Sequence, residues 1–169
     1  RIRTSSFIRH HGHPSLSKAK TNGNYVNSMM ALQEALDEGY DEALMLDVKG
    51  FVSEGSGENI FIVSENNIYT PDLSSALPGI TRDTIFTLAA AIGYKIVEKN
   101  ITCDDIYNAD ETFFTGTAAE VTPVRELDGR KIGSGTRGPV TEKLQSLYFD
   151  CVHGRNNQYL YWLAKGRCS

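Results

Sequence analysis

The chain has 169 residues, of which 40% are hydrophobic and 22% are charged, a size and composition typical of one globular domain. Its formal net charge of −4 excludes the basic surface typical of nucleic-acid binding, and no apolar run or signal-peptide pattern indicates a membrane partner. Its three cysteines, Cys103, Cys151 and Cys168, form no C-x-x-C pair, which argues against a disulfide scaffold or a zinc site and favours a reducing, cytoplasmic location.

The first segment, residues 2–8, has the apolar and β-branched composition of a strand. It leads into a loop that contains His10, His11 and His13. No acidic or sulfur ligand lies nearby in the sequence, and the histidine spacing fits no helix face. We therefore expect no metal at this loop and assign it no role.

A turn with two lysines comes next. Lys18 and Lys20 precede Thr21-Asn22-Gly23-Asn24, a run of residues that breaks regular structure and favours turns. A lysine amine held beside such a turn can form a Schiff base with a carbonyl compound. The alternative interpretation is a pair of ordinary solvated charges.

The pattern of residues 25–38 predicts a helix with a mostly apolar face that places Met29 and Met30 in the core, ending before Gly39. Residues 43–48 and 51–54 then predict a β-hairpin.

Two carboxylates flank the glycine turn that follows this hairpin. Glu54-Gly55-Ser56-Gly57-Glu58-Asn59 leads directly into a predicted strand at residues 60–63. A carboxylate at a strand end beside a core needs a partner, because burial of an unpaired charge is costly. The turn is therefore either solvated or built to hold a carboxylate against a cationic ligand.

The second half of the chain contains two turns that suit an anion. Pro78-Gly79 delivers the chain to a helix that ends near Ile92, with Thr81 as its expected cap, and the helix N-terminus can bind a phosphate. A predicted strand at residues 111–115 ends in Gly116-Thr117-Ala118-Ala119, which can also present its amides to an anion.

The remaining elements are predicted from local patterns. They are a hairpin turn at residues 66–67 before a strand at 68–70, a strand at 94–99, a helical turn at 104–108, a hairpin of residues 121–124 with 127–132, a helix at 140–152 and an apolar segment at 159–163.

Four of these stretches together resemble the class IV (fold type IV) aminotransferases, and most closely the bacterial-type branched-chain amino acid aminotransferases. The stretches are Lys20 with Asn24-Tyr25, Ser53 to Asn59, Leu77 to Arg82, and Gly116 to Pro123. The resemblance covers nearly the whole chain and implies a mixed α/β fold, a pseudo-barrel of mixed sheets with flanking helices. It also implies pyridoxal 5'-phosphate as the cofactor.

The resemblance implies a role for each matching residue. Lys20 would form the internal aldimine and act as the acid and base, Tyr25 would bind the phenolic oxygen of the cofactor, and Glu54 would pair with its ring nitrogen. The phosphate would be held by Ile80, Thr81 and Thr117. Amides of Thr117 and Ala118 would face the substrate carboxylate, and Glu58 would lie behind the residues in direct contact.

The implied reaction moves an amino group between leucine, isoleucine or valine and 2-oxoglutarate, in a homodimer or larger homo-oligomer. A D-amino acid aminotransferase and an aminodeoxychorismate lyase share the lysine and the glutamate, and Glu58-Asn59 with the Gly-Thr-Ala-Ala turn favours the branched-chain type. A non-catalytic domain that binds a partner or only the cofactor is the alternative from another class.

The sequence begins near the start of the large domain of this family. We therefore expect residues 1–169 to be the large cofactor-binding domain, without the small N-terminal domain. We also expect weak cofactor binding and little turnover from these residues alone.

Overall fold

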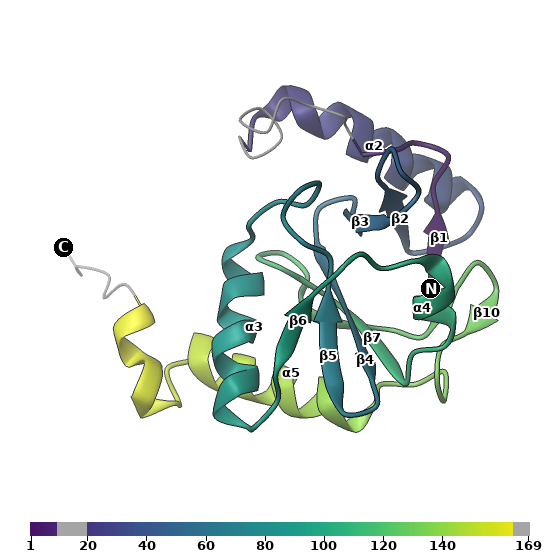
Figure 1. Ribbon diagram of the computed structural model, residues 1–169. Coiled ribbons are helices and arrows are strands. Elements are labelled where there is room, and N and C mark those ends of the chain that lie inside the picture. The colour runs from purple at the N-terminus through teal and green to yellow at the C-terminus, as the bar shows by residue number, and fades with distance from the viewer. Residues whose placement is uncertain (10–19, 164–169) are drawn as a thin grey trace.

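The structure, a computed structural model, describes residues 1–9 and 20–163. These residues form two five-stranded sheets that pack against each other, with helices on the outer faces (Figure 1). Several residues considered above lie outside the described residues: Lys18, Cys168, His10, His11 and His13.

The first sheet has the strand order β10-β9-β1-β2-β3. Its strands are β1 (Ile2–Thr4), β2 (Glu42–Leu46), β3 (Val52–Gly55), β9 (Glu126–Leu127) and β10 (Arg130–Lys131). β1 pairs in parallel with both β2 and β9, whereas β2–β3 and β9–β10 are antiparallel hairpins. The predicted hairpin of β2 and β3 is confirmed, but the strand predicted at residues 2–8 ends at Thr4.

The second sheet has the order β6-β5-β4-β7-β8. Its strands are β4 (Asn59–Ser64), β5 (Asn67–Thr70), β6 (Ile96–Glu98), β7 (Glu111–Gly116) and β8 (Glu120–Val124). The turn between β4 and β5 lies one residue earlier than predicted, at Glu65 and Asn66, whose φ values of 49° and 62° are those of a tight hairpin turn. The predicted pairing of residues 121–124 with 127–132 is wrong, because β8 pairs with β7 in this sheet and β9 pairs with β10 in the other.

Helices cover both outer faces (Figure 1). α2 (Asn22–Asp37) crosses the first sheet, while α3 (Ile80–Ala91) and α5 (Pro139–Val152) cover the second. Two short helices, α4 (Cys103–Tyr107) and the 3₁₀ helix η1 (Asn157–Trp162), complete the described elements. No helix in this part of the chain is long and apolar enough to cross a membrane.

Alternation along the strands builds the core, because successive side chains of a strand point to opposite faces. On β4, Phe61 and Val63 pack against α3 and α5, whereas Ile60 and Ile62 face the first sheet. The central strands are therefore apolar on both faces, which matches their nearly continuous apolar sequence. The mixed α/β class predicted from the sequence is confirmed.

α2 packs against the first sheet through small residues. Ala31 and Ala35 are fully buried against Ala43 and Met45 of β2. Met29 and Met30, predicted to lie in the core, are instead 67% and 50% exposed. The face of the helix that meets β2 is therefore not the predicted one, because small side chains allow the closer approach to β2.

A buried carboxylate holds the start of α5. Glu111 on β7 accepts hydrogen bonds from the backbone N–H groups of Val140, over 2.9 Å, and Thr141, over 2.7 Å. An ideal Cβ built on Gly138, the residue before the helix, would lie 2.1 Å from the carboxyl carbon of Glu111. The helix can approach β7 this closely only with glycine at position 138.

We predict that Gly138→Ala lowers the free energy of unfolding by about 1–3 kcal/mol, because the added methyl forces the Glu111 carboxylate away from the amides that it binds. Gly23→Ala is the matched control, because a Cβ on Gly23 in α2 meets nothing within 4 Å. This control is expected to be neutral or slightly stabilising. Urea unfolding of both variants measures the difference, and equal stabilities would contradict the packing described here.

Candidate active site

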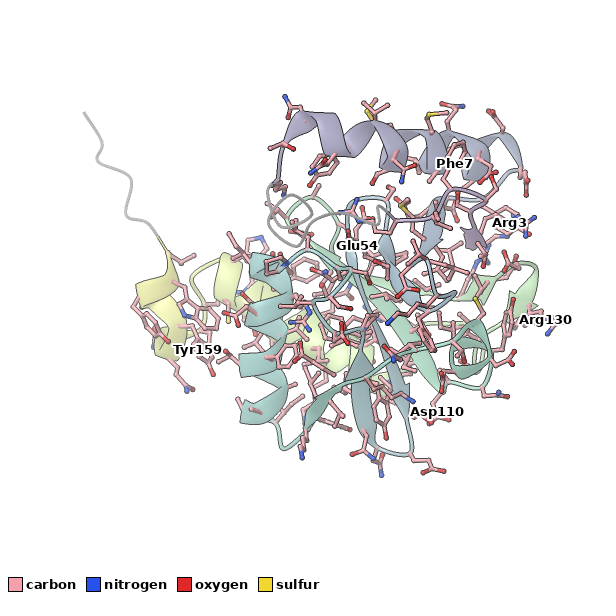
Figure 2. All side chains as sticks on the ribbon, turned by 45° about the horizontal axis from the view of Figure 1, so that its top comes forward. Arg3, Phe7, Glu54, Asp110, Arg130 and Tyr159 are labelled. Carbon is pink, nitrogen blue, oxygen red and sulfur yellow. The ribbon has the colours of Figure 1, made fainter. Side chains whose placement is uncertain are left out.

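A cavity of about 210 Å³ lies where the N-termini of α2 and α3 meet strand ends from both sheets. Glu54, at the end of β3, lies beneath α2 in Figure 2. The cavity is lined by six of the residues predicted from the sequence: Lys20, Tyr25, Glu54, Ile80, Thr81 and Thr117. Residues that are far apart in the chain thus meet in one place, while their individual roles stay predictions.

Two other residues lie elsewhere than the sequence predicted. Glu58, expected behind the contact residues, lines the cavity directly. Ala118 is exposed and is not among the lining residues, although Thr117 beside it is.

Glu54 is only 5% exposed, so its turn is not the solvated alternative. One carboxylate oxygen, Oε1, lies 2.6 Å from a terminal guanidinium nitrogen of Arg9. The other, Oε2, accepts the backbone N–H of Leu77 over 2.8 Å. Both oxygens are therefore satisfied inside the protein.

Arg9 is the residue that the sequence analysis missed. It follows β1, its backbone N–H donates to the carbonyl of Leu46 over 2.7 Å, and its side chain donates to Ser28 Oγ over 3.3 Å. A buried carboxylate needs a positively charged partner, so the sequence indicated that some cationic side chain lies beside Glu54. It did not indicate which one, because residues 9 and 54 are far apart in the chain and no local pattern links them.

Burial raises the pKa of Glu54, and the nearby guanidinium of Arg9 and the Leu77 amide act in the opposite direction. Lys20 also acts to lower the pKa of Glu54, which indicates that its amine lies within electrostatic reach of the carboxylate. The bond to Arg9 and the amide favour the ionised form, so the carboxylate can meet a further positive group in the cavity.

Lys20 and Tyr25 flank the start of α2. Thr21 is the N-cap residue of the helix, so Lys20 lies just before the helix and Tyr25 lies in its first turns. Lys20 is exposed and Tyr25 is half-buried, and both side chains line the cavity. The scaffold expected for a reactive amine is thus present beside the buried ion pair.

The opposite end of the cavity suits an anion. Gly79, rather than Thr81 as predicted, is the N-cap residue of α3, and no described side chain caps this helix. The first backbone amides of the helix and the positive end of its dipole thus remain available at Ile80 and Thr81, with Thr117 on the same wall.

Two lining residues carry polar atoms that lack partners within the described residues. These buried atoms are Thr115 Oγ1 and Arg9 Nε. Native interiors pair nearly all of their buried polar groups, so such atoms in a cavity wall suit a polar ligand. Residues 1–9 and 20–163 contain no group of histidine, cysteine or acidic side chains that could hold a metal ion.

Glu58 forms part of the wall beside Glu54. Its Oε2 accepts the backbone N–H of Gly57 over 3.1 Å. Burial, followed by the negative charge of the neighbouring Glu42, raises the pKa of Glu58 to about 7. Glu42 in turn accepts the backbone N–H of Ser56 over 3.3 Å, so the two carboxyl groups flank one turn.

Comparison with known proteins identifies the class of protein. The family model described as amino-transferase class IV matches residues 1–127. The match spans most of the chain, and the chain therefore belongs to the class IV aminotransferase family.

Individual relatives show which members of this family the chain is similar to. The branched-chain-amino-acid aminotransferase of Pseudomonas aeruginosa is 63% identical over 162 residues, which cover 96% of this chain and 53% of that protein. The enzyme of the same name from Escherichia coli K12 is 46% identical over 146 residues, which cover 86% of this chain and 47% of the relative. The chain thus spans about half the length of the curated relatives it matches.

Solved structures agree with this comparison. The branched-chain aminotransferase of Thermoproteus uzoniensis with norvaline has a TM-score of 0.91 at 47% identity, over 97% of this chain and 55% of that chain. The branched-chain amino acid aminotransferase of Thermobaculum terrenum in its PLP-form has a TM-score of 0.92 at 38% identity, over 97% of this chain and 54% of that chain. The fold predicted from the resemblance is confirmed.

The pKa of Glu58 leads to a prediction about stability and pH. Because the pKa rises from 4.5 to about 7 on folding, the folded state binds more protons between these values. The stability from Glu58 is therefore present at low pH and lost as the pH rises through about 7. We predict that Glu58→Gln, which cannot ionise, is more stable than the unaltered protein at pH 8 by on the order of 1–3 kcal/mol, and that this advantage shrinks toward pH 5.

Urea unfolding across this pH range measures the effect. Glu65→Gln, which removes one carboxylate from an exposed turn, is the control for the loss of a negative charge. An advantage of Glu58→Gln that stays constant across the pH range would contradict the raised pKa.

Proposed function

We propose that this chain is the cofactor-binding domain of a branched-chain amino acid aminotransferase that uses pyridoxal 5'-phosphate. The observation that carries the proposal is that one cavity brings together a lysine, a buried carboxylate and a helix N-terminus suited to an anion. The relatives and solved structures reported above, all branched-chain enzymes, support this activity over the D-amino acid and lyase alternatives.

The residues present fit the cofactor at both of its ends. Its phosphate would be held by the first amides of α3 at Ile80 and Thr81 and by Thr117, and its phenolic oxygen by Tyr25. The buried hydroxyl of Thr115, which has no partner within residues 1–9 and 20–163, supports a polar ligand in this place. When bound, the cofactor supplies an electron sink that stabilises negative charge at the α-carbon of the substrate.

Glu54 would hold a proton on the ring nitrogen of the cofactor. A carboxylate in a buried site favours the protonated, charged form of a neighbouring nitrogen. Arg9 and the Leu77 amide favour the ionised form of this carboxylate, against the effect of burial, and they fix its orientation. Arg9 is therefore a positioning residue, which acts on the ring through Glu54.

Lys20 would bind the cofactor covalently through its Nζ atom. In its free, neutral form the same amine would take the proton from the α-carbon of the amino acid and return a proton later in the reaction. Proximity to the cavity is supported by the influence of Lys20 on the pKa of Glu54.

The substrate would bind at the Gly116-Thr117-Ala118-Ala119 turn. Amides of Thr117 and Ala118 would meet the substrate carboxylate, and the amino group would pass from leucine, isoleucine or valine to 2-oxoglutarate. Residues 1–169 would form the large domain of the enzyme. A homodimer or larger homo-oligomer and a cytoplasmic location also stay predictions.

We predict that borohydride reduction of the full-length protein with pyridoxal 5'-phosphate leaves the pyridoxyl group on Lys20, because only this described lysine lines the cavity. Peptide mapping by mass spectrometry locates the label. Lys20→Arg should lose the label, while Lys49→Arg, which changes an exposed lysine, should keep it. A label on Lys18, or on no lysine, would overturn the assignment.

We predict that Glu54→Gln slows transamination of leucine with 2-oxoglutarate by at least about a hundredfold in the full-length enzyme, because a neutral amide does not favour the protonated ring nitrogen. Removing one partner of a buried ion pair also costs about 3–5 kcal/mol of stability. We therefore expect this variant to be less stable, because the Arg9 guanidinium is left buried without its charged partner. Activity is measured below the unfolding temperature of the variant, with Glu65→Gln as the control. Near-normal turnover would show that the ring nitrogen has another partner.

A further inference from the structure

Asn59, the first residue of β4, touches both ends of the cavity and is only 6% exposed. Its Nδ2 donates to the carbonyl oxygen of Leu77 over 2.8 Å and lies 3.5 Å from Glu54 Oε2. The backbone N–H of Leu77 donates to that same carboxylate oxygen over 2.8 Å. The shorter contacts dominate, since a hydrogen bond at 3.5 Å is weak. The three groups close a ring that ties Glu54 to the loop before α3.

Gly79 lets this loop rest directly on Asn59. An ideal Cβ on Gly79 would lie only 2.3 Å from Asn59 Oδ1. The backbone of Gly79, at φ −73° and ψ 140°, is one that alanine also adopts, so the glycine is required by space and not by conformation. Because Gly79 is the N-cap residue of α3, the contact lies where the anion-binding amides begin.

A second hydrogen bond holds the same loop farther from the helix. Ser53 Oγ donates to the carbonyl oxygen of Ser75 over 2.9 Å. This bond attaches the middle of the loop, which covers residues 71–79, to β3. The contacts of Asn59 fall at Leu77 and Gly79, and they therefore determine how the end of the loop delivers the chain to α3.

We propose that Asn59 is a positioning residue that sets the spacing between Glu54 and the N-terminus of α3. The inference rests on the proposed function, in which these are the ring-nitrogen end and the phosphate end of the cofactor site. A rigid ligand gains from both ends at once only when their spacing matches its own. Loss of Asn59 then weakens binding of the whole cofactor while each end keeps its own affinity.

Binding measurements on the full-length protein test this. Asn59→Ala removes the Nδ2 donor and adds no charge beside Glu54 or the first amides of α3. We expect its affinity for pyridoxal 5'-phosphate to fall by about tenfold or more, and its affinities for pyridoxal and for inorganic phosphate to change by less than about threefold. Asn67→Ala is the matched control, since Asn67 Nδ2 also donates to a backbone carbonyl, that of Glu65 over 3.1 Å, away from the cavity.

A double-mutant cycle tests the contact between the loop and Asn59. Gly79→Ala alone should weaken cofactor binding, because the new methyl displaces the Asn59 side chain. Asn59→Ala removes the obstructing oxygen, so the double variant should bind the cofactor no more weakly than Asn59→Ala alone. Circular dichroism and thermal unfolding exclude variants that fail to fold, and the cycle is read from those that do.

The outcomes separate this inference from the proposed function. An unaltered protein that does not bind pyridoxal 5'-phosphate would overturn both. If the unaltered protein binds the cofactor, three results would overturn the inference alone. These are unchanged cofactor affinity in Asn59→Ala, an equal loss for all three ligands, and additive effects in the cycle.

Discussion

The ion pair between Arg9 and Glu54 is the interaction on which the candidate site depends. Burying one unpaired charge costs several kcal/mol, so Glu54 occupies the interior only together with its cation and the Leu77 amide. The same Arg9 side chain reaches Ser28 of α2, and its backbone N–H donates to Leu46 at the end of β2. One charge pair thus joins the segment after β1, the helix that follows Lys20, and the end of β3.

Strand β4 anchors the region beside this pair. It is buried on both faces, with Phe61 stacked on Phe113 of the neighbouring strand β7 at a ring-centroid distance of 5.1 Å. At the opposite end of the cavity, Arg82 in the first turn of α3 binds Glu98 and donates to the carbonyl of Pro71 over 3.3 Å. The first amides of α3, where the phosphate is proposed to bind, are therefore held by contacts at both ends of the loop before this helix.

The sequence predicted most helices and strands correctly, but it predicted less well which face of an element is buried and which strands pair. Alternating or continuous apolar runs located the strands of the second sheet, because period-two patterning is a local property of the chain. The pattern of α2 failed for Met29 and Met30, because burial depends on which face meets β2 and small alanines fit closer than methionines. The hairpin predicted between residues 121 and 132 failed for a similar reason, since β8 and β9 follow each other in sequence but join different sheets.

The sequence by itself determined the four motifs, and with them the family, the lysine before α2 and the acidic turn after β3, because each motif is a short continuous stretch. Only the tertiary structure decided that Arg9 pairs with Glu54, that Glu58 lies in the cavity wall and that Asn59 meets the loop at Gly79. Residue patterns describe local geometry, whereas burial and charge pairing depend on segments that meet only after the whole chain has folded. The chemistry of the site is carried by local motifs, and its spacing is set by these distant contacts.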